Sequence, residues 1–293
     1  MSSGRTVVAA LHLHPVKSCR RVEVAEAVVG PYGLRGDREW QLSTPDGDRI
    51  TQRQHPALAR VQPVPISDGL RLRCEGRPEL EVARPESTDA VVRAYGGRIS
   101  VADAGDDAAR WFEDLLGIPC RLVAMAAGYR RRLPEAVDVF GQEVALGDAA
   151  PVLVASEASH RYLLDRATEP FGIERFRPNV IVRGAEPWAE DTWRTFTVGP
   201  ATFRAGLPWP RCSMPQIDQT TGERHREPAV VLKKYRWCAE APELSAPLRD
   251  LVCGNALFGI GCSAGPDGAL IRVGDPIEVV EAGGPLLPAP AAV

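Results

Sequence analysis

Cys212 lies in a segment that would present its thiol on a rigid loop. It follows Pro208-Trp209-Pro210-Arg211, and the two prolines restrict the backbone of this approach. The guanidinium of Arg211 would favour the thiolate, which is the form that binds metals and attacks electrophiles. A free cysteine more often behaves as a small, buried apolar residue. The loop therefore becomes a candidate site only if distant segments supply matching groups.

The segment His14-Pro15-Val16-Lys17-Ser18-Cys19 could supply anion-binding groups. Lys17 offers a positive charge for a phosphate, and Ser18 offers a short hydrogen-bond donor. No Walker glycines precede the lysine, so a nucleotide-binding loop is not indicated, and a solvated surface lysine is the alternative. His12 and His14 share one face of an expected strand, where they form either a metal-chelating pair or a packed pair.

Two further segments place an arginine at a turn. Arg38 follows Gly33 and Gly36, and Arg177 precedes Asn179 by two positions. An arginine fixed in this way can bind a phosphate through two hydrogen bonds, and an asparagine can both donate and accept. The alternatives are a surface ion-pair network around Arg38 and a loop at 177–179 whose side chains cap backbone groups.

The composition is that of a soluble globular protein with about two domains. The chain has 293 residues, of which 44% are hydrophobic and 25% charged, and a net charge of −3. Without a global basic field, nucleic acid is not an expected partner. We also expect no membrane span and no signal peptide, because no long apolar run occurs. The seven cysteines are an odd, scattered set without a CxxC pair, which argues against disulfides and structural zinc and favours a cytoplasmic location.

The elements that must position these groups are mostly short strands. Residues 6–100 alternate apolar and polar positions between turn signals such as Pro45-Asp46-Gly47-Asp48, which is typical of a closed or nearly closed barrel. One helix is predicted to interrupt them and to end at Gly117, because apolar residues recur at helical spacing. Those residues are Ala108, Trp111, Phe112, Leu115 and Leu116.

The second half continues with strands after a polar connection. We expect an N-terminal domain over residues 1–127, a connection over 128–147, a second domain over 148–283 and a flexible tail over 284–293. A buried strand is predicted at 151–155 and a helix at 156–168. Further strands are predicted at 180–182, 196–198, around Phe203, at 229–232 and as a strand–turn–strand at 271–279. The fold class is therefore mainly β or α+β.

Taken in order, these segments resemble the MOSC-domain molybdenum cofactor proteins. This family includes the mitochondrial amidoxime-reducing component and bacterial hydroxylaminopurine-detoxifying proteins. The resemblance extends over about residues 7–280 and includes Phe176-Arg177-Pro178-Asn179 and Val273-Gly274-Asp275-Pro276. The other matching segments are residues 15–19, 33–34, 37–40, 51–58, 156–159, 211–212, 232–236 and 257–259.

The resemblance implies an N-terminal MOSC-associated β-barrel domain joined to a MOSC β-barrel domain with a few helices. Molybdenum cofactor (Mo-molybdopterin) would bind between them, with Cys212 as the ligand of the metal. Asp218 occupies the family's acidic position after the cysteine, where it would orient the loop or substrate, or donate a proton. The residues implied to hold the pterin and its phosphate are Lys17, Ser18, Arg38, Asp148, Arg177, Asn179, Arg211 and Phe258.

The chain departs from the family pattern at two places. Pro215-Gln216 stand where relatives carry two threonines, and Ala149-Ala150 stand where relatives carry hydroxyl residues. Both changes remove side chains that could hydrogen-bond to cofactor or substrate.

The resemblance implies an oxidoreductase that reduces N-hydroxylated small molecules from N–OH to N–H. Because the chain contains no flavin or iron–sulfur motif, the electrons would come from a separate ferredoxin- or cytochrome-type protein with its reductase. Two alternatives stay open. One is a sulfur-handling protein with a persulfide on Cys212, and the other is a barrel that binds a small anion without catalysis.

Overall fold

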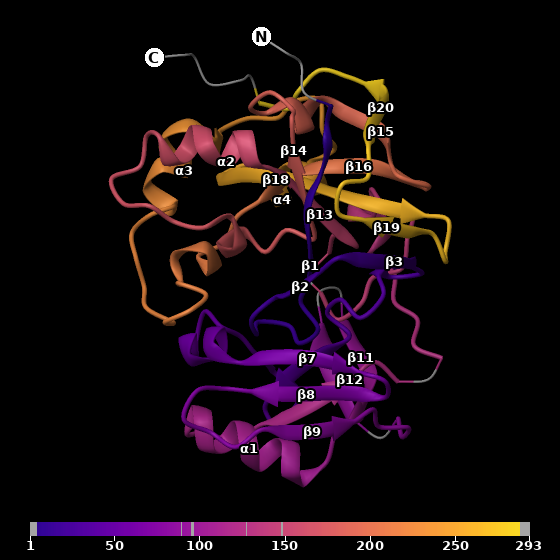
Figure 1. Ribbon diagram of the computed structural model, residues 1–293, viewed down its shortest axis with the longest axis vertical. Helices are drawn as coiled ribbons and strands as arrows, with labels where there is room; N and C mark the ends of the chain where they lie inside the picture. Colours follow the sequence, from indigo (N-terminus) through magenta and orange to yellow (C-terminus); the bar gives the residue numbers. More distant parts are fainter. Residues whose placement is uncertain (1–4, 89, 95–96, 127, 148, 288–293) are drawn as a thin grey trace.

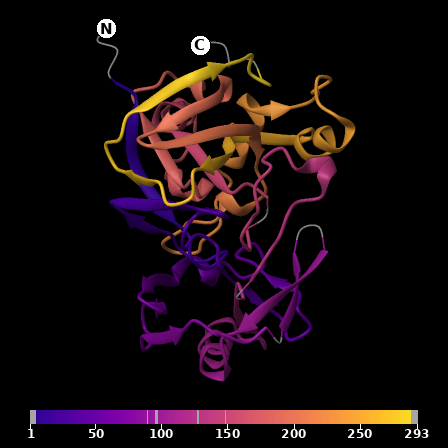
Figure 2. The ribbon, with the colours of Figure 1, turned by 90° about the vertical axis from the view of Figure 1, so that its right-hand side faces the viewer.

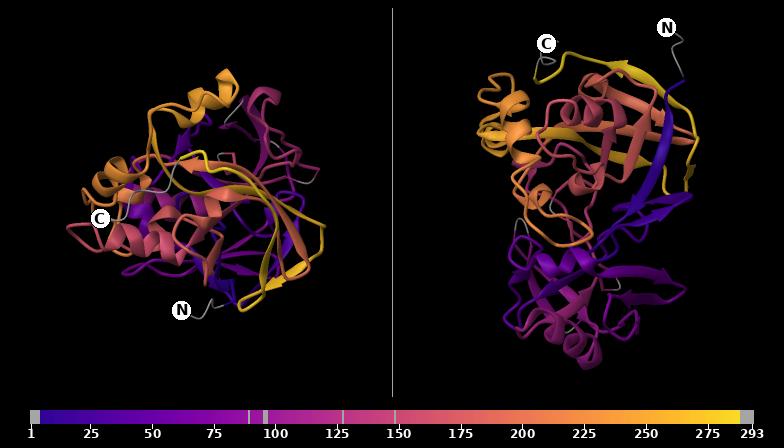
Figure 3. Two further views of the ribbon diagram at one scale, coloured as in Figure 1. Left: turned by 90° about the horizontal axis from the view of Figure 1, so that it is seen from above. Right: turned by 60° about the vertical axis from the view of Figure 1, so that its left-hand side comes forward.

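The computed structural model describes residues 5–88, 90–94, 97–126, 128–147 and 149–287. They form two bodies that are stacked along the long axis of the molecule (Figure 1; Figure 3, right). In Figure 1 the body with β13 (Val152–Ser156) and β18 (Asn255–Gly265) lies above the body with β8 (Gly69–Arg73) and α1 (Asp106–Leu116). The described residues contain twenty strands and four α-helices, so the predicted sheet-rich class with few helices is confirmed.

A nine-stranded sheet organises the upper body. Together with a three-stranded sheet it encloses one apolar core, in which Val152, Val180, Phe196 and Phe203 are fully buried. The large sheet has the order β2 (Val22–Val24), β1 (Val7–Leu13), β14 (Val180–Arg183), β13, β18, β16 (Ala201–Pro210), β15 (Trp193–Val198) and β20 (Ile277–Ala282), with β17 (Trp237–Cys238) also on β18. The smaller sheet is β19 (Leu270–Arg272), β3 (Glu26–Gly30) and β4 (Gly33–Leu34).

The lower body has its own core around Trp40, Leu42 and Phe112. The predicted apolar stripe of α1 packs into this core, and the helix ends where Gly117 adopts a left-handed φ of 69° and donates its N–H to the Glu113 carbonyl. One sheet is β10 (Ala90–Ala94), β11 (Gly97–Asp103), β12 (Arg121–Ala124), β5 (Trp40–Ser43) and β6 (Arg49–Ile50). The other is β7 (Gln62–Ile66), β8 and β9 (Leu80–Ala83).

The remaining helices belong to the upper body, except for η1 (Pro56–Arg60), whose Leu58 is buried in the core of the lower body. The predicted helix after Ser156 is confirmed as α2 (Glu157–Leu164), and the Ser156 hydroxyl caps it by accepting the Ala158 N–H at 3.1 Å. The others are α3 (Ala229–Tyr235), α4 (Ala246–Val252) and the short 3₁₀ helices η1 (Pro56–Arg60), η2 (Glu135–Val137), η3 (Ile173–Phe176), η4 (Ala189–Thr192) and η5 (Met214–Gln216).

The predicted strand at 229–232 is wrong, because this segment is α3. Val231 and Leu232 are buried against the cluster around Phe258, whereas Val230 is 54% exposed. A short apolar run does not distinguish a strand from a helix, and here the packing of one helical face decides.

Strand pairing extends across the predicted domain boundary at residue 127. β1 pairs antiparallel with β14, with Leu11 opposite Val180, and β3 pairs with β19, with Val28 opposite Leu270. The first strands therefore belong to the upper body, and Figure 2 shows the indigo N-terminal strand running along it. The sequence did not indicate this pairing, because pairing between residues so far apart leaves no local pattern.

Individual residues of the predicted connection and tail pack against the rest of the structure. Arg131 is buried and donates hydrogen bonds of 2.7 and 2.9 Å to the carbonyls of Ala145 and Gly147. Leu286 and Leu287 pack against the cluster around Leu207, and residues 288–293 lie outside the described part. Within the described ranges, no helix combines the length and the apolar character needed to cross a bilayer.

Candidate cofactor site

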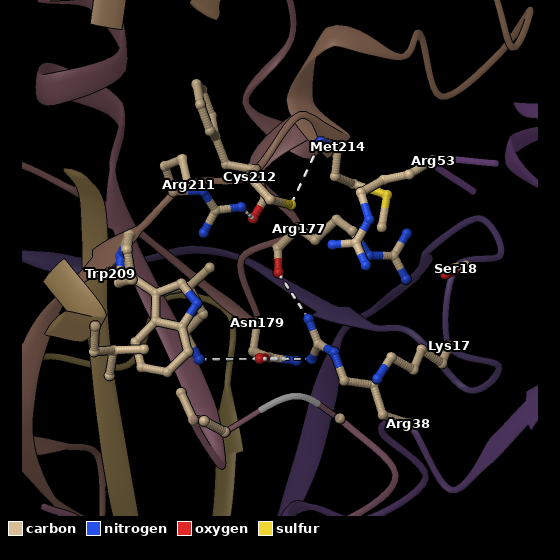
Figure 4. Close-up of a pocket in the computed structure, with 17 residues that line it drawn as sticks. Lys17, Ser18, Arg38, Arg53, Arg177, Asn179, Trp209, Arg211, Cys212 and Met214 are labelled. Carbon is tan, nitrogen blue, oxygen red and sulfur yellow. Dashed lines mark hydrogen bonds between the residues drawn. The ribbon is translucent and has the colours of Figure 1, made fainter. Parts of the chain in front are cut away.

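The predicted site residues converge on one pocket between the two bodies (Figure 4). Cys212 follows the end of β16, and Arg177 and Asn179 precede β14, while the N-terminal segments supply groups that follow β1 and precede β5. Seven of the predicted residues line this pocket: Lys17, Ser18, Arg38, Arg177, Asn179, Arg211 and Cys212.

Cys212 is exposed, as the sequence predicted for a thiol on a rigid loop. The Cys212 Sγ accepts the backbone N–H of Met214 at 3.4 Å. The preceding residue is held on both sides, because the Arg211 N–H donates to the Ala256 carbonyl at 2.9 Å and its guanidinium donates to the Phe176 carbonyl at 2.7 Å. The other six cysteines are buried or partly exposed, so Cys212 presents the most accessible thiol of the chain.

Arg38 joins segments that are far apart in the sequence. Its guanidinium donates to the carboxylate of Asp37, to the Asn179 Oδ1 at 3.2 Å and to the Arg177 carbonyl at 3.1 Å. Asn179 in turn accepts the Leu153 N–H at 3.0 Å. The predicted alternative of side chains that cap backbone groups therefore describes Asn179, and the predicted ion pair of Arg38 with Asp37 is also formed.

Buried polar atoms without hydrogen-bond partners among the described residues occur at the pocket. They include the Ser18 Oγ and the Arg177 Nη2, and these two residues are 1% and 7% exposed. The Arg177 Nη1 is satisfied by the Cys19 carbonyl at 2.6 Å. Burial, together with the charge of Arg38, lowers the pKa of Arg177 to about 9. Buried donors without partners are costly, so an anion that accepts from both atoms would stabilise the site.

Backbone strain also concentrates at this pocket. Ser18, Arg38 and Arg177 adopt left-handed φ angles of 71°, 53° and 56°, and they are three of the four non-glycine residues with positive φ among those described. Such conformations are unfavourable for residues with a side chain and tend to persist at functional sites.

The pocket is strongly cationic. Five basic side chains line it in the described structure, namely Lys17, Arg38, Arg53, Arg177 and Arg211, and the described lining contains no Asp or Glu. Asp37 lies behind Arg38 rather than in the lining. This arrangement suits a phosphorylated ligand next to a cysteine sulfur. The phosphate and the soft metal of a molybdenum–pterin cofactor would both find matching groups here.

Comparison with known proteins agrees with this chemistry. Residues 5–119 match the MOSC N-terminal beta barrel domain, and residues 141–278 match the MOSC domain. The chain is 34% identical over 284 residues to mitochondrial amidoxime reducing component 2 of Bos taurus, which covers 92% of this chain and 82% of that protein. The chain belongs to the MOSC-domain family of the amidoxime-reducing components.

Two other similarities are more limited. The MOSC-domain chain is 31% identical over 254 residues to molybdenum cofactor sulfurase of Danio rerio, which covers 77% of this chain but 30% of that protein. The solved structure of YiiM from Geobacillus stearothermophilus covers 45% of this chain and 55% of its own, at 17% identity and a TM-score of 0.28. A score this low does not establish a shared fold over the whole chain.

Two residues that the family resemblance implied do not line the pocket. Phe258 is buried behind it and stacks on Phe176 with ring centroids 4.0 Å apart, so it supports a lining residue. Asp218 forms an ion pair of 2.8 Å with Arg175 and accepts the N–H groups of Thr220 and Thr221 at 2.8 and 2.9 Å. A third implied residue, Asp148, lies outside the described residues.

The contacts of Asp218 favour a role in holding the loop over a role in proton transfer. Burial alone would raise its pKa, but the hydrogen bonds from Thr221, Thr220 and Arg175 outweigh burial and hold the pKa at about 2. A pKa this low favours the ionised carboxylate at neutral pH and disfavours proton donation. Of the two roles implied for Asp218, the geometry favours fixing the loop that follows Cys212.

The departures from the family pattern fall in different places. Ala149 and Ala150 line the pocket, so the missing hydroxyl groups would have faced a ligand. Pro215 is buried in η5, and neither it nor Gln216 lines the pocket. The lining also contains residues that were not predicted as site residues, among them Arg53, Trp209, Met214 and Leu251. Arg53 lies in the matched segment 51–58, and that was the signal available for it.

The two N-terminal histidines form a packed pair. His12 and His14 are 3% and 1% exposed, and His14 lies 3.5 Å from the Asp37 carboxylate. Burial, followed by the charges of Arg177 and Arg38, keeps the pKa of His14 well below its ordinary value. Of the two alternatives that the sequence left open, the burial of both rings favours packing.

Proposed function

We propose that this chain is a molybdenum cofactor-dependent oxidoreductase that reduces N-hydroxylated compounds. The reaction takes N–OH, two protons and two electrons to N–H and water. The observation that supports it most is an exposed cysteine thiol in a pocket with five basic side chains and buried, unpaired donors. The names of the amidoxime-reducing relatives agree with this reaction class.

The residues present fit the cofactor in distinct ways. Cys212 would bind the metal, because a thiolate is a soft ligand. Ser18 and Arg177 would donate to the pterin phosphate through the atoms that lack partners, and Arg38, fixed by Asp37, would add charge beside them. When bound, the cofactor would supply the two-electron redox chemistry, while the protein binds and orients it.

The electrons would come from a separate protein. The sequence contains no flavin or iron–sulfur motif, and we propose a ferredoxin- or cytochrome-type donor with its reductase. The exposed position of Cys212 would place the metal near the surface, where a partner can approach. The two protons that the reaction consumes would come from solvent or from groups other than Asp218, because the lowered pKa of Asp218 favours its ionised form at neutral pH.

The proposal is tested by expressing the chain in a host that makes the cofactor. We expect molybdenum and pterin at close to one equivalent per chain, and turnover of an amidoxime or hydroxylamine with a chemical electron donor. Cyanide-releasable sulfur without molybdenum would instead support a persulfide on Cys212, an alternative that the similarity to molybdenum cofactor sulfurase favours. The absence of metal and of such sulfur would leave an anion-binding barrel.

A further inference from the structure

Two cysteines outside the Cys212 pocket lie close together, at the two ends of the segment 238–253, which contains α4. The Sγ atoms of Cys238 and Cys253 are 4.0 Å apart and in S–H···S contact. Cys238 is buried at the end of β17, and Cys253 directly follows α4 and is partly exposed. The two thiols therefore differ in their access to solvent.

The backbone around both cysteines is fixed by the sheet. Cys238 lies opposite Asn255 in the pairing of β17 with β18, and its carbonyl accepts the Gly254 N–H at 2.8 Å. The Cys253 N–H donates to the Arg249 carbonyl at 2.7 Å at the end of α4. The sulfurs need to approach by about 2 Å to reach a disulfide bond length of about 2.05 Å, and side-chain rotation accounts for a movement of this size.

A cavity gives small molecules access to one of the two thiols. Cys253 lines a cavity of about 610 Å³ together with Glu240, Arg249 and Asp250. Its walls thus carry both signs of charge, which complements a small zwitterionic peptide such as glutathione. The Cys238 thiol donates to the Glu240 carbonyl at 3.6 Å. Burial and the contact with Cys253 raise the pKa of Cys238 to about 11, so Cys253 is the thiol that reacts first.

We propose that Cys238 and Cys253 are a redox-reactive pair that a low-molecular-weight disulfide of the glutathione type converts into an intramolecular disulfide. In the first step the Cys253 thiolate attacks one sulfur of the small disulfide, and one small thiol leaves. In the second step Cys238 loses its proton and attacks the Cys253 sulfur, and the second small thiol leaves with that sulfur's former bonding pair. Two protein thiols are oxidised by two electrons, and one small disulfide is reduced to two thiols.

The bond would close the segment 239–252 against β17. This segment contains α4, whose Leu251 lines the Cys212 pocket and whose Val252 packs with Leu207 in the neighbouring cluster. Oxidation would therefore fasten an element that forms part of one wall of the cofactor site. The proposal itself does not depend on the function of that site.

The test uses the full chain in mixtures of oxidised and reduced glutathione, followed by alkylation of free thiols and digestion with trypsin. Cleavage after Arg236 and Arg249 places the two cysteines in the separate peptides 237–249 and 250–272. We expect a cross-linked pair of these peptides whose fraction rises to more than half as the oxidised share increases and which disappears on treatment with dithiothreitol. Amide hydrogen exchange in α4 should slow several-fold in the oxidised form.

Three results would overturn the proposal. They are separate, alkylated peptides in fully oxidised glutathione, a lasting mixed disulfide of glutathione on Cys253, and linkage of Cys238 to Cys262, which fragmentation of peptide 250–272 distinguishes. Cys253→Ser should abolish the linked pair, whereas Cys120→Ser, in the lower body, should leave it unchanged. The measurement on the unaltered chain decides the question even if a variant fails to fold.

Discussion

The guanidinium of Arg38 donates a hydrogen bond of 3.1 Å to the backbone carbonyl of Arg177, 139 residues further along the chain. This contact brings into one pocket the two arginines that the sequence placed at turns as candidate phosphate-binding residues. It also leaves their roles distinct, because Arg38 is paired with Asp37 while one nitrogen of Arg177 has no partner in the described structure. The proposed phosphate would complete this arrangement.

The first prediction concerns cofactor affinity. Replacing either residue in Arg38→Met or Arg177→Met should weaken binding of the phosphorylated pterin about 10–100-fold, because hydrogen bonds to charged groups contribute about 1.5–3 kcal/mol. The measurement is molybdenum and pterin content per chain after purification. Arg35→Met is the matched control, since the Arg35 side chain is 56% exposed and pairs with Asp267 on the surface. Full occupancy in both pocket variants would place the phosphate elsewhere.

The second prediction concerns Asp218. Its folded-state pKa of about 2 lies below the ordinary value of 3.8, so its contribution to stability is present above pH 4 and lost as the pH falls toward 2. The carboxylate is partly exposed, and solvent screening limits the contribution to on the order of 1 kcal/mol. Asp218→Asn should lower the free energy of unfolding at pH 7 by this amount, as measured by urea unfolding, and should make that free energy less sensitive to acid. Glu223→Gln should behave as the unaltered chain.

The same variant tests the role of Asp218 in turnover. A residue that holds a loop changes the rate without changing which protons the reaction needs. Asp218→Asn should therefore keep the shape of the pH–rate profile, even if the rate falls. Disappearance of one limb of that profile would assign Asp218 to proton transfer after all.

The third prediction concerns the contribution of His12 to the loss of stability at low pH. Burial, with the charge of Arg21, lowers the pKa of His12 from 6.5 to about 4. The folded state therefore favours the neutral ring, and stability is present above pH 6.5 and lost as the pH falls toward 4. The loss from this group is about 3 kcal/mol. Urea titrations at pH 7 and pH 4.5 measure how much unfolding free energy is lost on acidification. His12→Gln should make this loss smaller, whereas the surface substitution His225→Gln should leave it unchanged. An unchanged pH dependence in His12→Gln would mean that other groups cause the loss.

The fourth prediction concerns a buried ion pair in the upper body. Arg236 donates to the Asp191 carboxylate, and the two side chains are 0% and 1% exposed. Asp191→Ala should lower the free energy of unfolding by about 3–5 kcal/mol, because it leaves a buried charge without its partner. Replacing both residues in Asp191→Leu/Arg236→Met should restore much of that loss.

The exposed ion pair of Arg183 and Glu157 provides the control for this comparison. Its side chains are 64% and 41% exposed, so Arg183→Ala should cost no more than about 1 kcal/mol. Equal losses in Arg183→Ala and Asp191→Ala would show that burial does not set the strength of these pairs.

Local patterns in the sequence predicted the elements in which periodicity and packing agree. The stripe that includes Trp111 and Phe112 is buried in α1, which ends before Gly117, and Ser156 caps α2. The helix α3 was not predicted, because its apolar run matches a strand as well as a helix, and only the fold shows that Val230 faces solvent. The pairing of β1 with β14 was not predicted, because it joins distant parts of the chain.

The site was predictable where residue type carried the chemistry. The prolines before Cys212 indicated an exposed thiol, and Lys17, Ser18, Arg38, Arg177 and Asn179 do meet at one pocket. Arg53 lies in the matched segment 51–58, but nothing there distinguishes it from its neighbours, so only the three-dimensional arrangement shows that it lines the pocket. The unpaired atoms of Ser18 and Arg177 could not be predicted, because the sequence does not specify which donors remain unsatisfied.

Anomalous diffraction at the molybdenum edge, from crystals of the protein loaded with its cofactor, tests the central claim most directly. The account predicts one strong molybdenum peak in the cationic pocket, at bonding distance from the Cys212 sulfur. A peak that is bound to other residues, or a Cys212 side chain that points away from the metal, would contradict it.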